Sequence, residues 1–126
     1  MKTIINTPKA PAPIGPYNQA VLTGNTLYTS GQIALNVNTG ALIMHSIEAE
    51  TKQVMDNLKA VLEAAGMNFE NVIKTSIFIS DMHNFSKIND VYATYFDADS
   101  APARETVEVA NLPKFVNVEI SMIAVK

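Results

Sequence analysis

The sequence has no cysteine and no tryptophan. Without cysteine, the protein cannot contain a disulfide framework, a zinc ribbon, a thiol nucleophile or a cysteine-bound iron–sulfur cluster. This composition fits the cytoplasm, where disulfides are rare. A chain of 126 residues can nevertheless bury roughly two-thirds of its surface, which is enough for a core without cross-links. We therefore expect one domain, residues 1–126.

Long apolar runs, glycine-rich loops and basic clusters are also absent. No apolar run reaches the roughly 20 residues of a membrane span, and the first residues turn polar too early for a signal peptide. The five glycines stand apart and form no phosphate-binding loop, so a nucleotide cofactor is not indicated. The net charge of -3 and the scattered lysines disfavour nucleic acid as a partner. We expect a soluble cytoplasmic protein without a cofactor.

Prolines and glycines divide the first part of the chain into an irregular arm and a hairpin. Four of the six prolines lie within residues 1–16, where fixed φ angles and missing N–H groups favour extended, irregular backbone. Short strands are expected at 19–22 and 26–29, because Gly24-Asn25 between them suits a two-residue turn. A second turn is expected over 36–40, before the first helix.

Two amphipathic helices are predicted. Apolar residues recur at helical spacing from Ile47 to about Ala65, and Gly66 is placed to end this helix in a left-handed conformation. A second apolar stripe over 85–96 predicts the other helix, with Pro102 beyond its end. Because each helix has one apolar stripe, both are expected to cover the same face of a sheet.

Three further strands complete the expected fold. Residues 71–80 contain a β-branched and aromatic cluster that predicts a strand buried on both faces, reached through a crossover connection. Two more strands are expected at 104–110 and 116–125, separated by a turn at 111–114. With one strand before the first helix in addition to the two located above, the order β-β-β-α-β-α-β-β is typical of an α+β fold, here with a mixed six-stranded sheet.

The sheet face away from the helices needs a cover. Four apolar residues of the last two strands cannot all pack beneath two helices together with the hairpin. They are Val107, Val109, Val118 and Ile120. Self-association is the expected cover, because large exposed apolar patches mark protein contacts.

Arg104 is the only arginine among the nine basic residues. A guanidinium binds a carboxylate through two parallel hydrogen bonds, a geometry that lysine cannot reproduce. Arg104 could therefore anchor a small carboxylate ligand. The more ordinary role for such a residue is a pair with Glu105 or Glu108 on an edge strand. The residue alone leaves both interpretations open.

Glu119 lies inside the last predicted strand, between two apolar residues. If it is buried, desolvation raises its pKa toward neutrality, which suits a general acid or base. The alternation of Asn117, Glu119 and Ser121 is also compatible with a solvent-facing position. The sequence does not decide between a buried and a solvent-facing Glu119.

A serine and a glycine follow the second predicted strand, and two histidines lie elsewhere. The N–H of Gly31 can approach a ligand closely and Ser30 can supply another donor, although such a pair is also common in turns. Neither His45 nor His83 has a neighbour at metal-ligand spacing, so no metal site is predicted.

Five short motifs are spread along nearly the whole chain. They are Ile14-Gly15-Pro16-Tyr17, Thr29-Ser30-Gly31-Gln32-Ile33, Asn89-Asp90-Val91-Tyr92, Pro102-Ala103-Arg104 and Val118-Glu119-Ile120. Together, in this order and spacing, they resemble the signature blocks of the Rid/YjgF family, the reactive intermediate deaminases. The resemblance implies a chorismate-mutase-like fold and a homotrimer whose central barrel is built from the sheet faces.

The resemblance also implies a reaction. Members hydrolyse enamines and imines such as 2-aminoacrylate, 2-iminopropanoate and 2-iminobutanoate to 2-oxo acids and ammonia. Carried onto the matching positions, Arg104 would clamp the substrate carboxylate, and Glu119 would orient and activate water. Ser30 and the Gly31 N–H would hydrogen-bond near the reacting group. An imine carbon is already electrophilic, so positioning, a placed water and proton transfer suffice without a cofactor.

The implied site is a cleft between subunits. Tyr17 would line it, and Asn89 would support it. One departure is Thr106, two residues after Arg104, where many deaminase-active members have cysteine. Thr106 can still form hydrogen bonds in the cleft. With threonine in place of cysteine, the resemblance does not fix the substrate preference or the catalytic rate of this chain.

Other functions are compatible with the same residues. A non-catalytic binding module would hold a 2-oxo acid or a related small carboxylate for regulation rather than turnover, and Thr106 is its best support. Some members of the family are described as ribonucleases, translation inhibitors or chaperone-like proteins. The acidic charge disfavours a ribonuclease, and the composition gives no positive signal for a chaperone.

Overall fold

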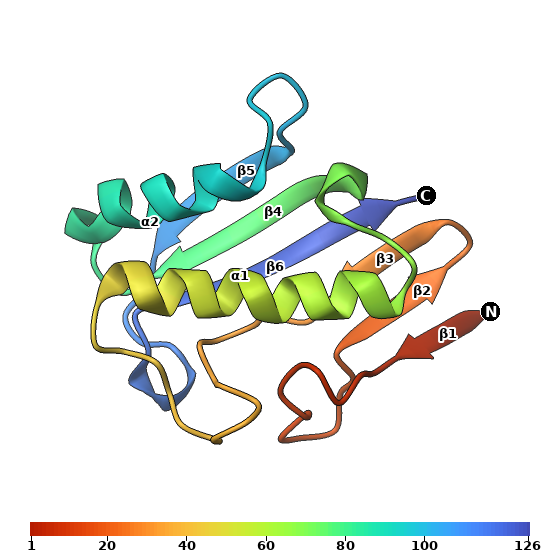
Figure 1. Cartoon of the computed structure of the whole chain (residues 1–126), viewed down its shortest axis with the longest axis horizontal. Helices are drawn as coiled ribbons and strands as arrows, with labels where there is room; N and C mark the ends of the chain where they lie inside the picture. The colour runs from red at the N-terminus through yellow and green to blue at the C-terminus, as the bar shows by residue number, and fades with distance from the viewer.

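In the computed structural model, which describes residues 1–126, two α-helices lie across one face of a six-stranded sheet (Figure 1). The helices are α1 (Ile47–Ala64) and α2 (Phe85–Tyr92). The strands are β1 (Lys2–Ile5), β2 (Ala20–Thr23), β3 (Thr26–Thr29), β4 (Val72–Ile79), β5 (Ala103–Glu108) and β6 (Val118–Val125). The expected element order and the one-sided helices are confirmed.

The sheet has the strand order β1-β2-β3-β6-β4-β5. Only β4 and β5 run parallel, and α2 makes the crossover between them. The mixed sheet is therefore confirmed. The sequence patterns did not locate β1, which pairs with β2 from Lys2 opposite Thr23 to Ile5 opposite Ala20.

Local signals set the ends of the hairpin and of α1. Gly24 has a φ of 56°, so the expected two-residue turn with Asn25 joins β2 to β3. The Ser46 side chain accepts a hydrogen bond from the N–H of Ala49 at 3.0 Å and caps α1. Gly66, with a φ of 72°, follows the helix end as predicted.

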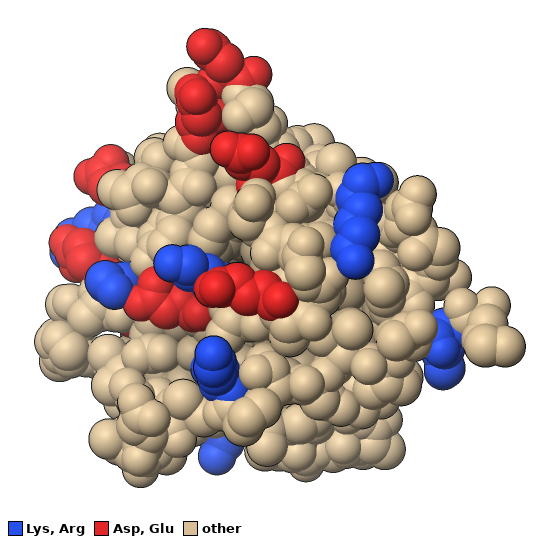
Figure 2. Space-filling view, turned by 45° about the vertical axis from the view of Figure 1, so that its right-hand side comes forward, with Lys and Arg blue, Asp and Glu red and all other residues tan.

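The second helix is shorter than its apolar stripe. α2 ends at Tyr92 and continues as a 3-10 turn over Ala93–Tyr95. The segment between this turn and β5 projects at the top of Figure 1, and acidic side chains gather on that projection in Figure 2. Asp97 and Asp99 belong to it. Neither helix combines the length and hydropathy that crossing a membrane would require.

The core lies between the helices and the sheet. α1 contributes Val54, Met55, Leu58, Val61 and Leu62, and the sheet contributes Leu27, Ile77, Ile79, Val118, Ile120 and Met122. Along β6 every second residue is buried, which is the period that a strand with one covered face requires.

Two expectations about burial were wrong. Val118 and Ile120 lie fully buried beneath the helices rather than on the open face, because the alternation of β6 turns them inward. β4 is buried on one face only, with Ser76 and Phe78 half-buried on the other. The open face does carry Tyr28 and Val107, both more than 40% exposed, so its cover by self-association stays a prediction.

A buried carboxylate joins α1 to the beginning of β6. Glu50 is 0% exposed. One of its oxygens accepts hydrogen bonds from the N–H groups of Asn117 at 2.8 Å and Val118 at 3.2 Å. The other accepts from the Asn117 side-chain amide at 2.8 Å. Three donors thus satisfy the carboxylate without a cation, and the start of β6 is held in place.

Candidate functional site

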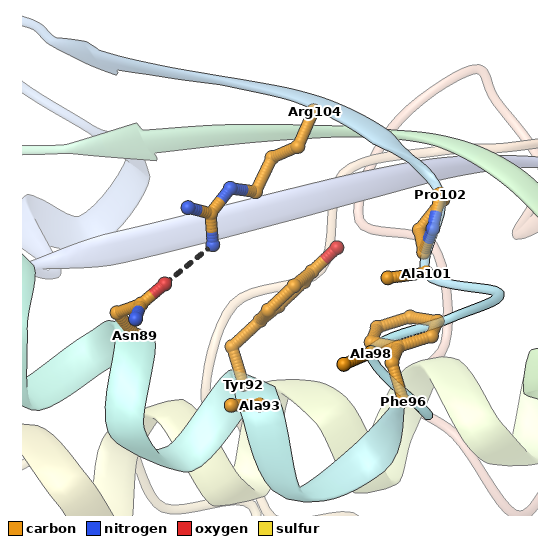
Figure 3. A pocket seen from close by; sticks show the side chains of 8 residues that line it. All are labelled: Asn89, Tyr92, Ala93, Phe96, Ala98, Ala101, Pro102 and Arg104. Atoms are coloured by element: carbon orange, nitrogen blue, oxygen red, sulfur yellow. Dashed lines mark hydrogen bonds between the residues drawn. The ribbon is translucent and has the colours of Figure 1, made fainter.

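Arg104 points from β5 toward α2. Its Nη1 donates a hydrogen bond to Oδ1 of Asn89 at 2.7 Å (Figure 3). The guanidinium carbon lies 5.0 Å from the centroid of the Tyr92 ring and 5.6 Å from that of Phe85. Aromatic faces attract a cation at such distances. We call Arg104, Asn89, Tyr92 and Phe85 the arginine cluster.

The carboxylates beside Arg104 in sequence are occupied elsewhere. Glu105 forms an ion pair with Lys74 at 2.8 Å and accepts a hydrogen bond from the Ser76 hydroxyl. Glu108 accepts from the N–H of Met82 at 2.7 Å. The alternative in which Arg104 pairs with Glu105 or Glu108 is therefore wrong. Apart from Nη1, the guanidinium donors have no acceptor in the chain, so this edge of the arginine is free for a ligand.

Glu119 is half-buried on the open face of the sheet. A backbone bridge between Gln32 and Ile120 brings the neighbouring Gly31 against its side chain. Burial raises the pKa of Glu119 above its ordinary value. No donor in the chain bonds the carboxylate, and no cation pairs with it. Glu119 is thus neither fully buried nor fully exposed to solvent, the two alternatives that the sequence left open.

Gly31 lies against Glu119, Ser30 precedes Gly31 in the chain, and Tyr17 shares a cavity with Gly31. We call these four residues the glutamate cluster. The N–H of Gly31 has no acceptor in the chain. The Ser30 hydroxyl donates to the carbonyl oxygen of Asn18 at 2.6 Å, so it offers a ligand an acceptor rather than the expected donor. Tyr17 and Gly31 line one small cavity of about 40 Å³, and the Tyr17 side chain is exposed.

The two clusters lie on opposite faces of the sheet. Arg104 is the lateral partner of Thr75, whose hydroxyl is 2.8 Å from Oη of Tyr92 beneath α2. Glu119 is the lateral partner of Phe78, on the face away from the helices. Because paired residues of neighbouring strands point to the same face, Arg104 and Glu119 cannot meet within one chain.

Thr106 lies two residues after Arg104 and therefore shares its face of β5. Its lateral partner Ile77 is buried beneath the helices, and Thr106 itself is half-buried. Thr106 thus belongs on the side of the arginine cluster. The structure brings the seven candidate residues together as two groups rather than one.

The histidines give no candidate catalyst. Nδ1 of His83 lies 2.7 Å from Oδ1 of Asp81 on the exposed turn before α2, and His45 is exposed in a loop. No three carboxylate or imidazole side chains come together in a way that could hold a metal ion.

Sequence reasoning missed the aromatic part of the arginine cluster. Tyr92 belongs to the apolar stripe that predicts the second helix, and it is buried, but its ring also lies beneath the guanidinium. Phe85, Asn89 and Tyr92 follow one another at spacings of four and three residues. This spacing places them on one face of α2 and could have linked them.

Replacing Gly31 by alanine is expected to displace the Glu119 carboxyl group. An added Cβ would lie 2.7 Å from its carboxyl carbon, which is closer than atoms tolerate. We expect the side chain to turn toward solvent, so that its pKa falls toward the ordinary value of glutamate. Titration of the Glu119 carboxyl carbon by NMR measures this change.

Gly15→Ala is the matched control, because its added Cβ would meet only the Tyr17 ring at 3.6 Å. An unaltered Glu119 titration in the Gly31 variant would show that the contact does not restrain the carboxyl group.

Known proteins of one family are similar to this chain over nearly its whole length. A family model described as endoribonuclease L-PSP matches residues 7–126. A RutC family protein of Pyrococcus horikoshii is 49% identical, over 100% of this chain and 99% of that protein. A protein of Dermatophagoides farinae named 2-iminobutanoate/2-iminopropanoate deaminase is 50% identical, over 98% of this chain and 96% of that protein.

Solved structures share the fold. A Rid family protein of Yersinia pestis has a TM-score of 0.96 and 48% identity, with 100% of both chains covered. E. coli TdcF with bound serine has a TM-score of 0.93 and 41% identity, with 98% of both chains covered. The expected YjgF-like architecture is thus confirmed. The similar proteins carry both the specific deaminase name and the broader RutC name.

Proposed function

Because this chain belongs to the Rid/YjgF family, the family of the endoribonuclease L-PSP model, we propose that it hydrolyses reactive 2-imino acids to 2-oxo acids and ammonia. The observation that carries the proposal is the lone arginine with no carboxylate partner, braced by Asn89 and two aromatic rings. Such a guanidinium is suited to bind the carboxylate of a small substrate. The deaminase names of proteins about half identical to this chain support the choice of reaction.

Arg104 positions the substrate. Nη1 is held by Asn89, and the remaining N–H groups bind the carboxylate. This contact fixes the adjacent imine carbon, C2, relative to the other reacting groups. Thr106, on the same face of β5, adds a hydroxyl near the bound acid. The serine bound to E. coli TdcF also carries a carboxylate.

Glu119 activates the water. As the water oxygen adds to C2, the carboxylate accepts one water proton and passes it to the imine nitrogen, which gives a carbinolamine. The carboxylate then takes the hydroxyl proton of the carbinolamine and delivers it to the amine nitrogen. The C2–N bond breaks, ammonia leaves and the 2-oxo acid forms. An enamine enters after taking a proton at C3, which makes it an imine. The desolvation that raises the pKa of Glu119 makes its carboxylate a better proton acceptor.

The complete site combines two copies of the chain. Because Arg104 and Glu119 lie on opposite faces of the sheet, the arginine cluster of one copy faces the glutamate cluster of the next. Tyr17, Ser30 and the Gly31 N–H then border the same substrate. A homotrimer closes this arrangement with three equal sites, each copy contributing residues 1–126 as one domain.

The test couples a threonine or serine dehydratase to the purified protein and follows the decay of the imine absorbance. We expect faster decay with the wild type. Arg104→Lys is expected to lower kcat/KM roughly 10- to 100-fold, because lysine keeps the charge but loses the paired hydrogen bonds. Lys59→Ala, on the exposed side of α1, is the control and is expected to match the wild type.

Unchanged imine decay with folded wild-type protein would contradict the proposed reaction. If such protein still bound 2-oxo acids, the result would support a non-catalytic binding module.

A further inference from the structure

A cavity of about 380 Å³ extends from Arg104 to the projecting segment between α2 and β5 (Figure 3). Its size falls within the range of sites that hold ligands much larger than a three-carbon acid. It is lined by Asn89, Tyr92, Ala93, Phe96, Ala98, Ala101, Pro102 and Arg104. The proposed reaction uses only the arginine end and leaves the rest of the cavity without a role.

The polar groups of this cavity are concentrated at one end. Arg104 and Asn89 bond each other there, and the remaining guanidinium donors are free. Oη of Tyr92 is engaged with the Thr75 hydroxyl at 2.8 Å, so the tyrosine presents its ring to the guanidinium and to the cavity. A ligand therefore has one place for a carboxylate, beside Arg104.

The other end of the cavity is apolar. Phe96, Pro102 and three alanines supply its walls. None of these side chains carries a hydrogen-bond donor or acceptor, so a polar ligand group would lose its contacts with water there. An apolar ligand group would bind favourably there, because burial removes its surface from water. The small size of the alanines leaves the space open.

The far end of the cavity also disfavours a second charge on the ligand. It offers no cation, and the residues that flank Ala98 in the projecting segment, where Figure 2 shows acidic side chains gathered, are Asp97 and Asp99. A second carboxylate at the far end of a ligand would lose its contacts with water without gaining a partner. The cavity therefore suits a monocarboxylate with an apolar tail.

We propose that this cavity is a side-chain pocket that makes the enzyme prefer 2-imino acids with branched or longer apolar side chains over the three-carbon imino acid. The inference rests on the proposed function and deepens it. The carboxylate binds Arg104, C2 stays near the incoming water, and the side chain extends past Tyr92 toward Ala98 and Ala101.

The test compares imines generated from alanine, leucine and glutamate by an amino acid oxidase. Each buried methylene favours binding by about fourfold, so the three additional carbons of the leucine side chain should raise kcat/KM about 60-fold over the alanine-derived imine. The glutamate-derived imine should be the poorest substrate. Calorimetry with pyruvate and 4-methyl-2-oxopentanoate measures the same preference as a ratio of Kd values, without turnover.

Two variants fill the pocket while Arg104 remains. Ala101→Phe and Ala98→Leu should each lower the ratio of leucine-derived to alanine-derived kcat/KM by about tenfold, because the long side chain loses its space. Ala64→Leu, at the exposed end of α1, is the matched control and should keep the wild-type ratio.

The outcomes separate the two proposals. Tighter binding of 4-methyl-2-oxopentanoate by a protein that hydrolyses no imine would support the pocket and contradict the deaminase. Efficient hydrolysis with equal preference for both imines, in the wild type and in both filled variants, would overturn the pocket alone. A change of oligomeric state in the filled variants, without a change of preference, would show that a neighbouring copy occupies the cavity, and would also overturn it.

Discussion

Replacing Glu119 by glutamine is expected to lower kcat for 2-iminopropanoate hydrolysis by about 10³-fold, because the amide cannot accept the water proton. The side chain keeps its size and its contact with Gly31. Glutamine is neutral, and burial disfavours the charged form of Glu119. The variant should therefore fold at least as well as the wild type near neutral pH. Single-turnover kinetics measures the loss of rate, and a thermal melt measures the stability of the variant.

The pH dependence follows from the same group. The folded pKa of Glu119 is raised, and catalysis requires the ionised carboxylate. The rate should therefore fall as the pH drops through this raised pKa, which lies above the usual value for glutamate. Its contribution to stability has the opposite sign, since the protonated form is favoured on folding and this advantage is lost as the pH rises. A flat kcat between pH 5 and pH 8 in Glu119→Gln, at wild-type magnitude, would refute the assigned role.

Glu50→Ala is expected to lower the free energy of unfolding by about 3–5 kcal/mol. The change leaves three donors without an acceptor: the buried Val118 N–H group and the half-buried N–H group and side-chain amide of Asn117. It also leaves a void beneath the start of β6. Urea unfolding followed by circular dichroism measures the loss.

Glu50→Gln serves as the comparison. Its amide oxygen still accepts hydrogen bonds from the β6 backbone, so we expect a loss of about 1–2 kcal/mol. Equal stability of the alanine variant and the wild type would mean that water replaces the carboxylate. The Glu50 hydrogen bonds would then not be what holds the start of β6 in place.

Local signals account for the elements that the sequence predicted well. The hairpin needs only Gly24 at a positive φ, and α1 needs an apolar stripe, the Ser46 cap and Gly66. β1 depends instead on pairing with residues 20–23, and a four-residue edge strand carries too little pattern to show this. β6 is different, because it has eight residues and lies between β3 and β4 in the sheet. The alternation of Asn117, Glu119 and Ser121 already indicated that Val118 and Ile120 share one face, but which face the helices cover depends on the tertiary packing.

The candidate site was predictable only in its parts. The rarity of arginine singled out Arg104, and the unpaired carboxylate singled out Glu119. Their placement on opposite faces depends on the registers of β4 with β5 and with β6, which no local pattern encodes. The occupied Ser30 hydroxyl likewise depends on a hydrogen bond to Asn18 in another segment.

The opposite-face placement of Arg104 and Glu119 has a genetic consequence. In the proposed assembly every copy supplies one half of two different sites, so a defect in one half does not remove the other. A copy lacking the arginine still provides its glutamate, and a copy lacking the glutamate still provides its arginine. Two alleles that are each inactive could therefore complement one another within mixed assemblies, at about a quarter of the sites when the copies mix at random. Selection on such a protein acts on pairs of surfaces rather than on single chains.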